Sequence, residues 1–286
     1  MKRIVFLSGK GGTGKTTLAS VFARCVEDVT VVDADVDAAN LHLVFRPEIE
    51  ETGIYRGSSV AVRDDEACTG CGRCREVCRF DAIDADLEID PLACEGCGAC
   101  VTACPVDALR LVERPSGEWY VGRAARHPMV GAELYPGEEV SGKLVSVIRE
   151  KADQIAKDEG SKRIAIDGSP GIGCPVIAST TGTQVAVLVT EPSRSGLHDL
   201  ERILGVVRHF GVPAYLILNK ADLSESLAEE IEAYAGREGL PLLGRIPYDE
   251  RVLASLRVGR SPSDDPESPA GRAMAEAIAA LMEEIG

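Results

Sequence analysis

The chain has 286 residues, of which 46 are acidic and 31 are basic, so its formal net charge is −15. This charge leaves little basic surface for nucleic-acid phosphates and argues against nonspecific nucleic-acid binding. No apolar stretch is long enough to span a bilayer, and the N-terminal residues do not have a signal-peptide pattern. We therefore expect a cytoplasmic protein that binds neither nucleic acid nor a membrane.

A phosphate-binding loop is predicted near the start of the chain. The apolar run from Ile4 to Leu7 predicts a buried strand, and an apolar helical pattern begins at Leu18. Between them, residues 9–16 have the pattern Gly-x-x-x-x-Gly-Lys-Thr, whose backbone N–H groups and following helix suit phosphate. Lys15 would neutralise the terminal phosphates, and the Thr16 hydroxyl would ligate Mg²⁺. The predicted nucleotide-binding residues of this loop are Gly11, Gly12, Thr13, Gly14, Lys15, Thr16 and Thr17.

An additional lysine, Lys10, precedes the paired glycines of the loop. The segment from Lys10 to Thr17 reads Lys-Gly-Gly-Thr-Gly-Lys-Thr-Thr. Here the chain resembles the deviant P-loop ATPases, which include MinD, ParA, the Mrp-type carriers and the nitrogenase iron protein. In that family the first lysine reaches the nucleotide of a partner subunit. The resemblance therefore implies a homodimer that sandwiches ATP, with Lys10 and Lys15 as catalytic residues.

Carboxylates close two of the predicted strands. Asp33 and Asp35 follow the strand from Val29 to Val32, and Asp167 ends the strand that begins at Arg163. The carboxyl ends of parallel strands lie beside the phosphate loop. Asp167 has the Walker B arrangement, which holds Mg²⁺ through water. The resemblance implies that Asp35 orients or activates the attacking water and that Asp33 supports the Mg²⁺ shell.

The nucleobase site is predicted from the later strands. The strand from Ala214 to Leu218 ends at Asn219, and the resemblance implies that Asn219 contacts the base edge. It also implies that the backbone at Pro247 lines the base. The string Asn-Lys-x-Asp, ending at Asp222, also resembles the guanine-reading motif of GTPases. ATP is therefore the favoured nucleotide, and GTP remains the alternative.

Eight of the ten cysteines lie in two runs with the same spacing. The pattern Cys-x-x-Cys-x-x-Cys-x-x-x-Cys at residues 68–78 recurs 26 residues later, so the segment is an internal duplication. Such a pair is typical of a bacterial-type ferredoxin with two [4Fe–4S] clusters, in which the fourth cysteine of each run serves the other cluster. The expected ligands are Cys68, Cys71, Cys74 and Cys104 for one cluster, and Cys78, Cys94, Cys97 and Cys100 for the other.

Cys174 lies outside these runs, seven residues after Asp167. In the nitrogenase iron protein a cysteine at this spacing ligates a cluster shared across the dimer. That cluster needs two cysteines from each subunit, and the chain offers no second candidate. The alternative is a buried structural thiol.

The expected fold is a doubly wound, mostly parallel α/β sheet of the P-loop NTPase kind, with an inserted bacterial-type ferredoxin α+β domain. The expected boundaries are 1–58 and 115–286 for the ATPase domain and 59–114 for the insert. Residues 115–140 are rich in Pro and Gly and are predicted to be a return linker. Residues 64–113 hold 12 acidic and 4 basic residues, a net of −8, which suits either a docking face for a basic partner or a solvated surface.

Three functions compete at this point. The favoured one is an ATPase, slow alone and stimulated by a partner, that couples the nucleotide state of its dimer to electron transfer through two [4Fe–4S] clusters. Its cofactors would be ATP, Mg²⁺ and the clusters, and its partner a redox or cluster-accepting protein. The second is an Mrp-type cluster carrier, although these usually have a Cys-x-x-Cys in the ATPase domain. The third is a positioning switch of the MinD or ParA kind; residues 268–286 carry a single base, Arg272, which disfavours a membrane-binding tail.

Overall fold

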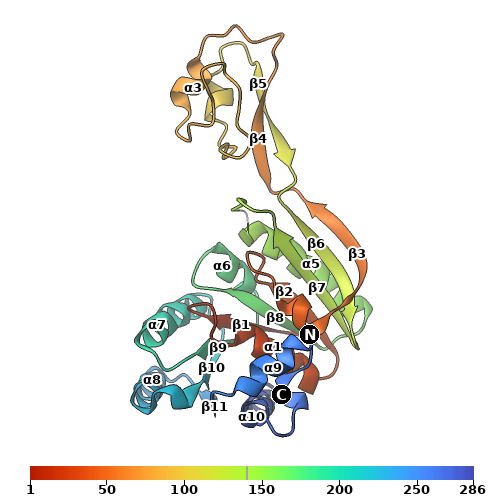
Figure 1. The fold of residues 1–286 in the computed structure, drawn as a ribbon, viewed down its shortest axis with the longest axis vertical. Helices are drawn as coiled ribbons and strands as arrows, with labels where there is room; N and C mark the ends of the chain where they lie inside the picture. The colour runs from red at the N-terminus through yellow and green to blue at the C-terminus, as the bar shows by residue number, and fades with distance from the viewer. Residues whose placement is uncertain (140) are drawn as a thin grey trace. The chain divides into compact units, whose positions relative to one another are not determined.

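The computed structural model describes residues 1–139 and 141–286, which form two compact units (Figure 1). We call them the P-loop unit, Met1–Gly53 with Trp119–Glu133 and Ser141–Gly286, and the cysteine unit, Ile54–Glu118 with Leu134–Val140. The predicted insert, 59–114, lies within the cysteine unit, which also takes in a second segment of the chain. No helix in the described ranges is long and apolar enough to cross a membrane.

The P-loop unit is organised on a sheet of nine strands in the described residues, in the order β11-β10-β9-β1-β8-β2-β7-β6-β3. The central strand β1 pairs in parallel with β8 and β9, and β2 pairs in parallel with β8 and β7. The prediction of a large, mostly parallel α/β sheet is confirmed. The strands are β1 Lys2–Ser8, β2 Val29–Ala34, β3 Glu48–Tyr55, β6 Gly117–Ala124, β7 His127–Leu134, β8 Arg163–Pro170, β9 Val185–Thr190, β10 Ala214–Asn219 and β11 Leu242–Ile246.

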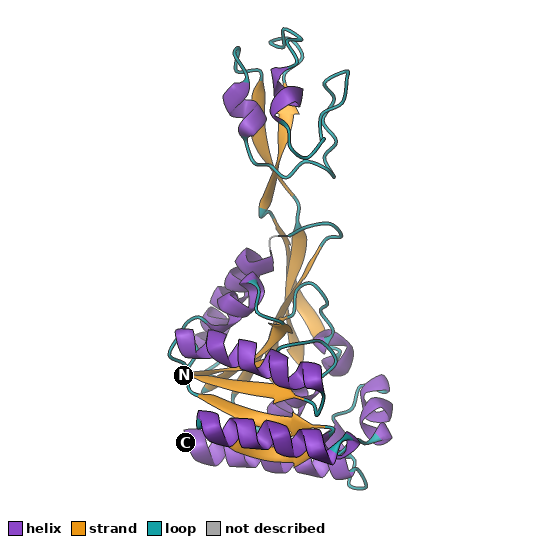
Figure 2. Cartoon of the chain, turned by 90° about the vertical axis from the view of Figure 1, so that its left-hand side faces the viewer, coloured by secondary structure: helices purple, strands orange, loops and turns teal. Residues whose placement is uncertain are grey.

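Helices cover both faces of this sheet, as Figure 2 shows. Successive side chains of a strand point to opposite faces, so Ile4 and Phe6 of β1 share one face, and they belong to a core cluster with residues of α1 and α10. The Phe6 and Phe22 rings meet edge to face at 5.6 Å, which anchors α1 directly after the phosphate loop. The helices are α1 Lys15–Cys25, α2 Leu41–Phe45, α5 Ser141–Asp158, α6 Cys174–Thr180, α7 Arg194–His209, α8 Glu225–Glu238, α9 Glu250–Arg257 and α10 Pro269–Ile285, with short 3-10 turns η1 Ala221–Leu223 and η2 Pro262–Asp264.

The return linker predicted for residues 115–140 is wrong for the part that the structure describes, because β6 and β7 occupy most of it; residue 140 lies outside the described residues. The apolar run from Pro128 to Ala132 is buried and pairs in parallel with β2, so that Gly131 lies opposite Asp33. A Cβ at Gly131 would lie 2.3 Å from the Tyr120 hydroxyl oxygen. The glycine that suggests a linker is therefore required by close packing inside the sheet.

The cysteine unit repeats one small structure twice. Its strands β4, Ser58–Arg63, and β5, Leu109–Arg114, pair in antiparallel fashion. Its helices α3, Arg73–Val77, and α4, Ala99–Ala103, each begin after a left-handed glycine, Gly72 at φ 74° and Gly98 at φ 76°. Glycine adopts this conformation without steric cost, which explains why both runs carry it at the same position. The duplication in the sequence is thus matched by a duplication in the structure.

Candidate functional site

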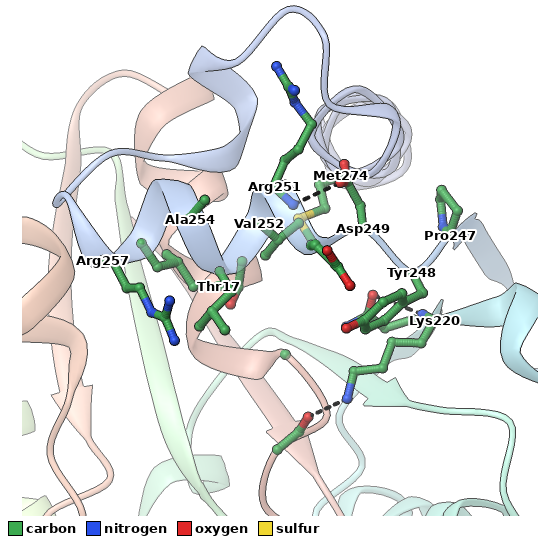
Figure 3. Close-up of a pocket in the computed structure, with 16 residues that line it drawn as sticks. Thr17, Lys220, Pro247, Tyr248, Asp249, Arg251, Val252, Ala254, Arg257 and Met274 are labelled. Atoms are coloured by element: carbon green, nitrogen blue, oxygen red, sulfur yellow. Dashed lines mark hydrogen bonds between the residues drawn. The ribbon is translucent and has the colours of Figure 1, made fainter.

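The phosphate loop joins β1 to α1 and is braced by the end of β10. Gly14 has φ 97°, and a Cβ there would lie 2.3 Å from Asn219 Nδ2. Asn219 Nδ2 donates to the Thr13 carbonyl at 2.7 Å, and Asn219 Oδ1 accepts from the Lys220 N–H at 3.0 Å. Lys220 Nζ donates to the Gly12 carbonyl at 3.0 Å (Figure 3). Asn219, predicted at the base edge, therefore holds the loop through Nδ2, while its Oδ1 orders the turn after β10 at Lys220.

A buried lysine and two carboxylates meet under this loop. Lys15 Nζ lies 3.2 Å from Asp167 Oδ1 and 3.6 Å from Asp35 Oδ2. Burial acts to lower the pKa of Lys15, but the Asp167 and Asp35 carboxylates outweigh it, so the pKa is raised and the ammonium stays charged. Burial also raises the pKa of Asp35, despite the opposing charge of Lys15. The predicted residues Lys15, Asp35 and Asp167 thus lie together in one charged cluster.

Asp33 lies behind this cluster and is fully buried. Its two carboxylate oxygens accept backbone N–H groups, from Asp35 at 3.3 Å and from Leu41 at 2.9 Å. Burial first, and the charge of Asp167 second, raise the pKa of Asp33 to about 8. The hydrogen bonds fix the loop that carries Asp35, so Asp33 supports the site from beneath.

Two cavities adjoin the loop. The first, of about 970 Å³, is lined by residues 11–17 and by Asp35 and Asn40. Asp167 Oδ2 and Thr13 Oγ1 are buried beside it and have no hydrogen-bond partner within residues 1–139 and 141–286. Orphaned oxygens at a glycine-rich loop fit a hydrated magnesium ion and phosphate, because Mg²⁺ prefers oxygen ligands and keeps several waters. Thr16 and Asp167 would hold the ion, and Asp33 would support them.

The second cavity, of about 670 Å³, extends from Gly12 and Gly14 to Pro247, Tyr248 and Met274 (Figure 3). It continues from the phosphate loop and has apolar walls suited to a flat nucleobase. Asp222 Oδ1 accepts the Tyr248 N–H at 2.6 Å, so one oxygen of this carboxylate is used within the protein. Pro247 lines this cavity, and its contact with a base stays a prediction, whereas Asp222 orders the segment that forms the cavity wall.

The structure adds Glu191, which the sequence interpretation does not include. Glu191 follows β9 directly, and its carboxylate binds both Lys10, at 2.6 Å, and Lys220, at 2.9 Å. The rule that singles out Asp33 and Asp167 applies equally to this position, because a polar residue after a central parallel strand lies at the carboxyl edge of the sheet. The sequence therefore contains a signal that could have identified Glu191, namely its position directly after an apolar strand.

The eight cysteines of the two runs line two small cavities in the cysteine unit. Each cavity contains three cysteines of one run and the fourth of the other, which is the predicted grouping. In the part of the chain that the structure describes, no three His, Cys, Asp or Glu side chains are arranged to hold a metal ion. The cavities are lined by Cys68, Cys71, Cys74 and Cys104, and by Cys78, Cys94, Cys97 and Cys100.

Cys174 differs from the buried thiol that the sequence suggests. It is exposed at the first residue of α6. The reason is that β8 ends at Pro170 and the chain leaves the core before Cys174 is reached. The prediction of a buried structural thiol is therefore wrong.

The loop, its buried lysine and the strand-end carboxylates define a P-loop nucleotide-binding protein. The CobQ/CobB/MinD/ParA nucleotide binding domain matches residues 4–262, and the chain belongs to this family. An uncharacterized protein of Methanocaldococcus jannaschii is 36% identical over 227 residues, covering 78% of this chain and 79% of that protein. The septum site-determining protein MinD of Synechocystis is 25% identical over 266 residues, covering 90% and 79%. The Mg-ADP complex of MinD from Pyrococcus horikoshii shares the fold, with a TM-score of 0.61 and 20% identity over 100% of this chain and 97% of that one.

These relatives overturn the functional prediction that the sequence favours most. An ATPase that couples its dimer to electron transfer is wrong, because the relatives that cover nine-tenths of the chain include septum site-determining MinD proteins, one of them named as putative. The solved structures that share its fold include MinD and McdA. The cysteine runs concern the cysteine unit alone, whereas these relatives match nearly the whole chain. The positioning switch is the better supported of the three functions.

Proposed function

We propose that the protein is an ATPase switch of the MinD and ParA kind. In this proposal MgATP binds at the β1–α1 loop, two copies close around it, and hydrolysis lets them separate. The observation that carries the proposal is the family match together with Lys10 beside the cavity-lining loop. A state-dependent dimer of this kind would recruit a protein partner in one nucleotide state only.

In this proposal each residue of the nucleotide site has a separate role in binding or hydrolysis. Lys15 and the loop N–H groups would bind the phosphates, and Thr16 and Asp167 would hold magnesium, which when bound supplies charge neutralisation at the phosphates. Asp35 lines the same cavity and would orient the attacking water. Asp33 keeps the Asp35 backbone fixed through its hydrogen bond. Lys10 would stabilise the phosphate charge on the partner subunit's nucleotide.

The test of this proposal is the oligomeric state. Wild-type protein should sediment as a monomer with ADP and as a dimer with Mg²⁺ and a non-hydrolysable ATP analogue. Lys10→Ala should bind the analogue and stay monomeric, because the nucleotide contacts within one subunit remain. Wild-type protein that is monomeric in every nucleotide state would contradict the proposal.

We also propose that the cysteine unit binds two [4Fe–4S] clusters, as part of the switch and not as an electron carrier. The two four-cysteine cavities support this, and the Ala108 N–H donates to Cys104 Sγ at 3.3 Å, a hydrogen bond typical of a ligating thiolate. The spacing of the two runs also suits [4Fe–4S] clusters better than zinc, because both runs have the pattern of two-cluster ferredoxins and not that of a zinc finger.

Anaerobically prepared protein should contain about eight iron and about eight acid-labile sulfide per chain. Cys71→Ser should lose about four of each, because it removes one ligand of one cluster only. Elemental and sulfide analysis measures both. Cys174→Ser is the matched control and should retain the wild-type content, since Cys174 lies outside the two runs. Zinc as the dominant metal would refute the cluster assignment.

A further inference from the structure

The lysine on which the proposed dimer depends is bound within its own subunit. Lys10 Nζ lies 2.6 Å from Glu191 Oε1, 3.1 Å from Ser193 Oγ and 3.0 Å from Ser195 Oγ. All three acceptors come from the junction between β9 and α7. Its backbone is fixed as well, because Ser8 Oγ donates to the Lys10 carbonyl at 2.8 Å. The side chain is thus fully engaged in cis.

Glu191 joins this lysine to the rest of the phosphate loop. Glu191 Oε2 binds Lys220 Nζ at 2.9 Å, and Lys220 Nζ also donates to the Gly12 carbonyl. Lys220 has φ 54°, an uncommon conformation for a residue with a side chain, at the turn after β10. One carboxylate therefore connects the two lysines that flank the loop.

The ion pair between Lys10 and Glu191 is partly shielded from water, so removing it should change dimer formation by a measurable amount. The Glu191 side chain is 20% exposed and the Lys10 side chain 29% exposed. Burial acts to raise the pKa of Glu191, but hydrogen bonds from Lys10 and Lys220 outweigh it and keep the carboxylate ionised. Three acceptors already use the three N–H donors of Lys10, so binding a phosphate of a second subunit requires the lysine to give up contacts in its own subunit.

We propose that Glu191 is a positioning residue that holds Lys10 in cis and that dimer closure requires Lys10 to leave it. The inference rests on the proposed ATP-dependent dimer and adds a competitor built into each subunit. Glu191 opposes closure, so weakening its hold on Lys10 strengthens the dimer. Each dimer contains two copies of Lys10, one from each subunit. The free-energy effect of losing one Lys10–Glu191 ion pair therefore enters the dimer dissociation constant twice.

Glu191→Gln tests this, because glutamine keeps the size of the side chain and removes its charge. Loss of a partly exposed ion pair changes an equilibrium about two- to fivefold, so the dimer dissociation constant should fall about four- to twenty-fivefold. Sedimentation equilibrium with Mg²⁺ and a non-hydrolysable ATP analogue measures it. Ser195→Ala, which removes one neutral acceptor, should shift the constant in the same direction by about twofold per subunit, or about fourfold per dimer, and serves as the second variant.

Two controls separate this from a structural effect. Glu201→Gln changes the same charge at an exposed position of α7 and should leave the constant unchanged. In a Lys10→Ala background, Glu191→Gln should leave the protein monomeric, because there is no lysine to release; a dimer in the double variant would show that Glu191 acts by another route. A dimer equal to or weaker than wild type in both Glu191→Gln and Ser195→Ala overturns the inference while the switch stands. A wild-type protein that never dimerises removes the proposed function itself.

Discussion

Lys15→Ala is expected to lose MgATP binding, with an affinity at least about a hundredfold below wild type. The ammonium would supply charge-assisted hydrogen bonds to the phosphates, and alanine cannot. The substitution also leaves the buried carboxylates of Asp35 and Asp167 without their cation, so the site becomes repulsive to phosphate. Isothermal titration calorimetry with a non-hydrolysable ATP analogue measures the loss.

Asp35→Asn is the matched comparison. It removes one charge from the same cluster and should bind the nucleotide at least as tightly as wild type, because a negative charge next to the phosphates is gone. Turnover should fall by about a hundredfold or more, since the water-orienting carboxylate is lost. Wild-type affinity in Lys15→Ala, or normal turnover in Asp35→Asn, would contradict these assignments. A far higher affinity for GTP than for ATP would reverse the base preference.

The second large effect concerns the dependence of stability on pH. Folded Asp33 keeps its proton up to a pKa of about 8, whereas an unfolded aspartate releases it near its ordinary value of 3.8. Unfolding therefore releases a proton between these values, and the free energy of unfolding falls as pH rises through this window. The slope from this group approaches about 1.4 kcal/mol per pH unit, or about 3 kcal/mol between pH 5.5 and 7.5.

Asp33→Asn should remove this slope, because asparagine does not titrate; its single amide oxygen can keep one of the two backbone hydrogen bonds, so the variant should also be less stable at both pH values. Urea unfolding at the two pH values, followed by tryptophan fluorescence, measures the difference. The single tryptophan, Trp119, lies in the P-loop unit and reports on that unit. Asp158→Asn, at an exposed position of α5, should keep the wild-type slope. Equal slopes in wild type and Asp33→Asn would show that Asp33 is ionised in the folded protein.

The sequence predicts much of the P-loop unit because its signals are local. β1, α1 and the strands that carry Asp33 and Asp167 have apolar runs followed by specific polar residues. β6 and β7 are not predicted from the sequence, because their positions depend on pairing with distant strands, while the local sequence suggests a linker. Gly131 illustrates this, since its role depends on the Tyr120 ring across the sheet.

Side-chain partners in the site are harder to predict than the positions of the residues. Asn219 ends its strand as expected, but its amide holds the phosphate loop, which only the contact between β10 and Thr13 reveals. Lys10 is identified by its motif, whereas its pairing with Glu191 joins residues 181 positions apart. The grouping of the cysteines is easier to predict, because the two runs resemble those of two-cluster ferredoxins, in which the fourth cysteine of each run joins the first three of the other run.

The pairing between β2 and β7 bears on where the cysteine unit is inserted in the chain. The two strands are neighbours in the sheet, with Asp33 opposite Gly131, although the whole cysteine unit except Leu134–Val140 lies between them in sequence. The chain leaves the P-loop unit after Gly53 and returns to it at Trp119, and the parallel pairing of β2 with β7 beside the nucleotide loop is intact. This connection is a tolerant insertion point, at which evolution or a protein engineer can exchange one module for another of different chemistry while the nucleotide machinery is retained.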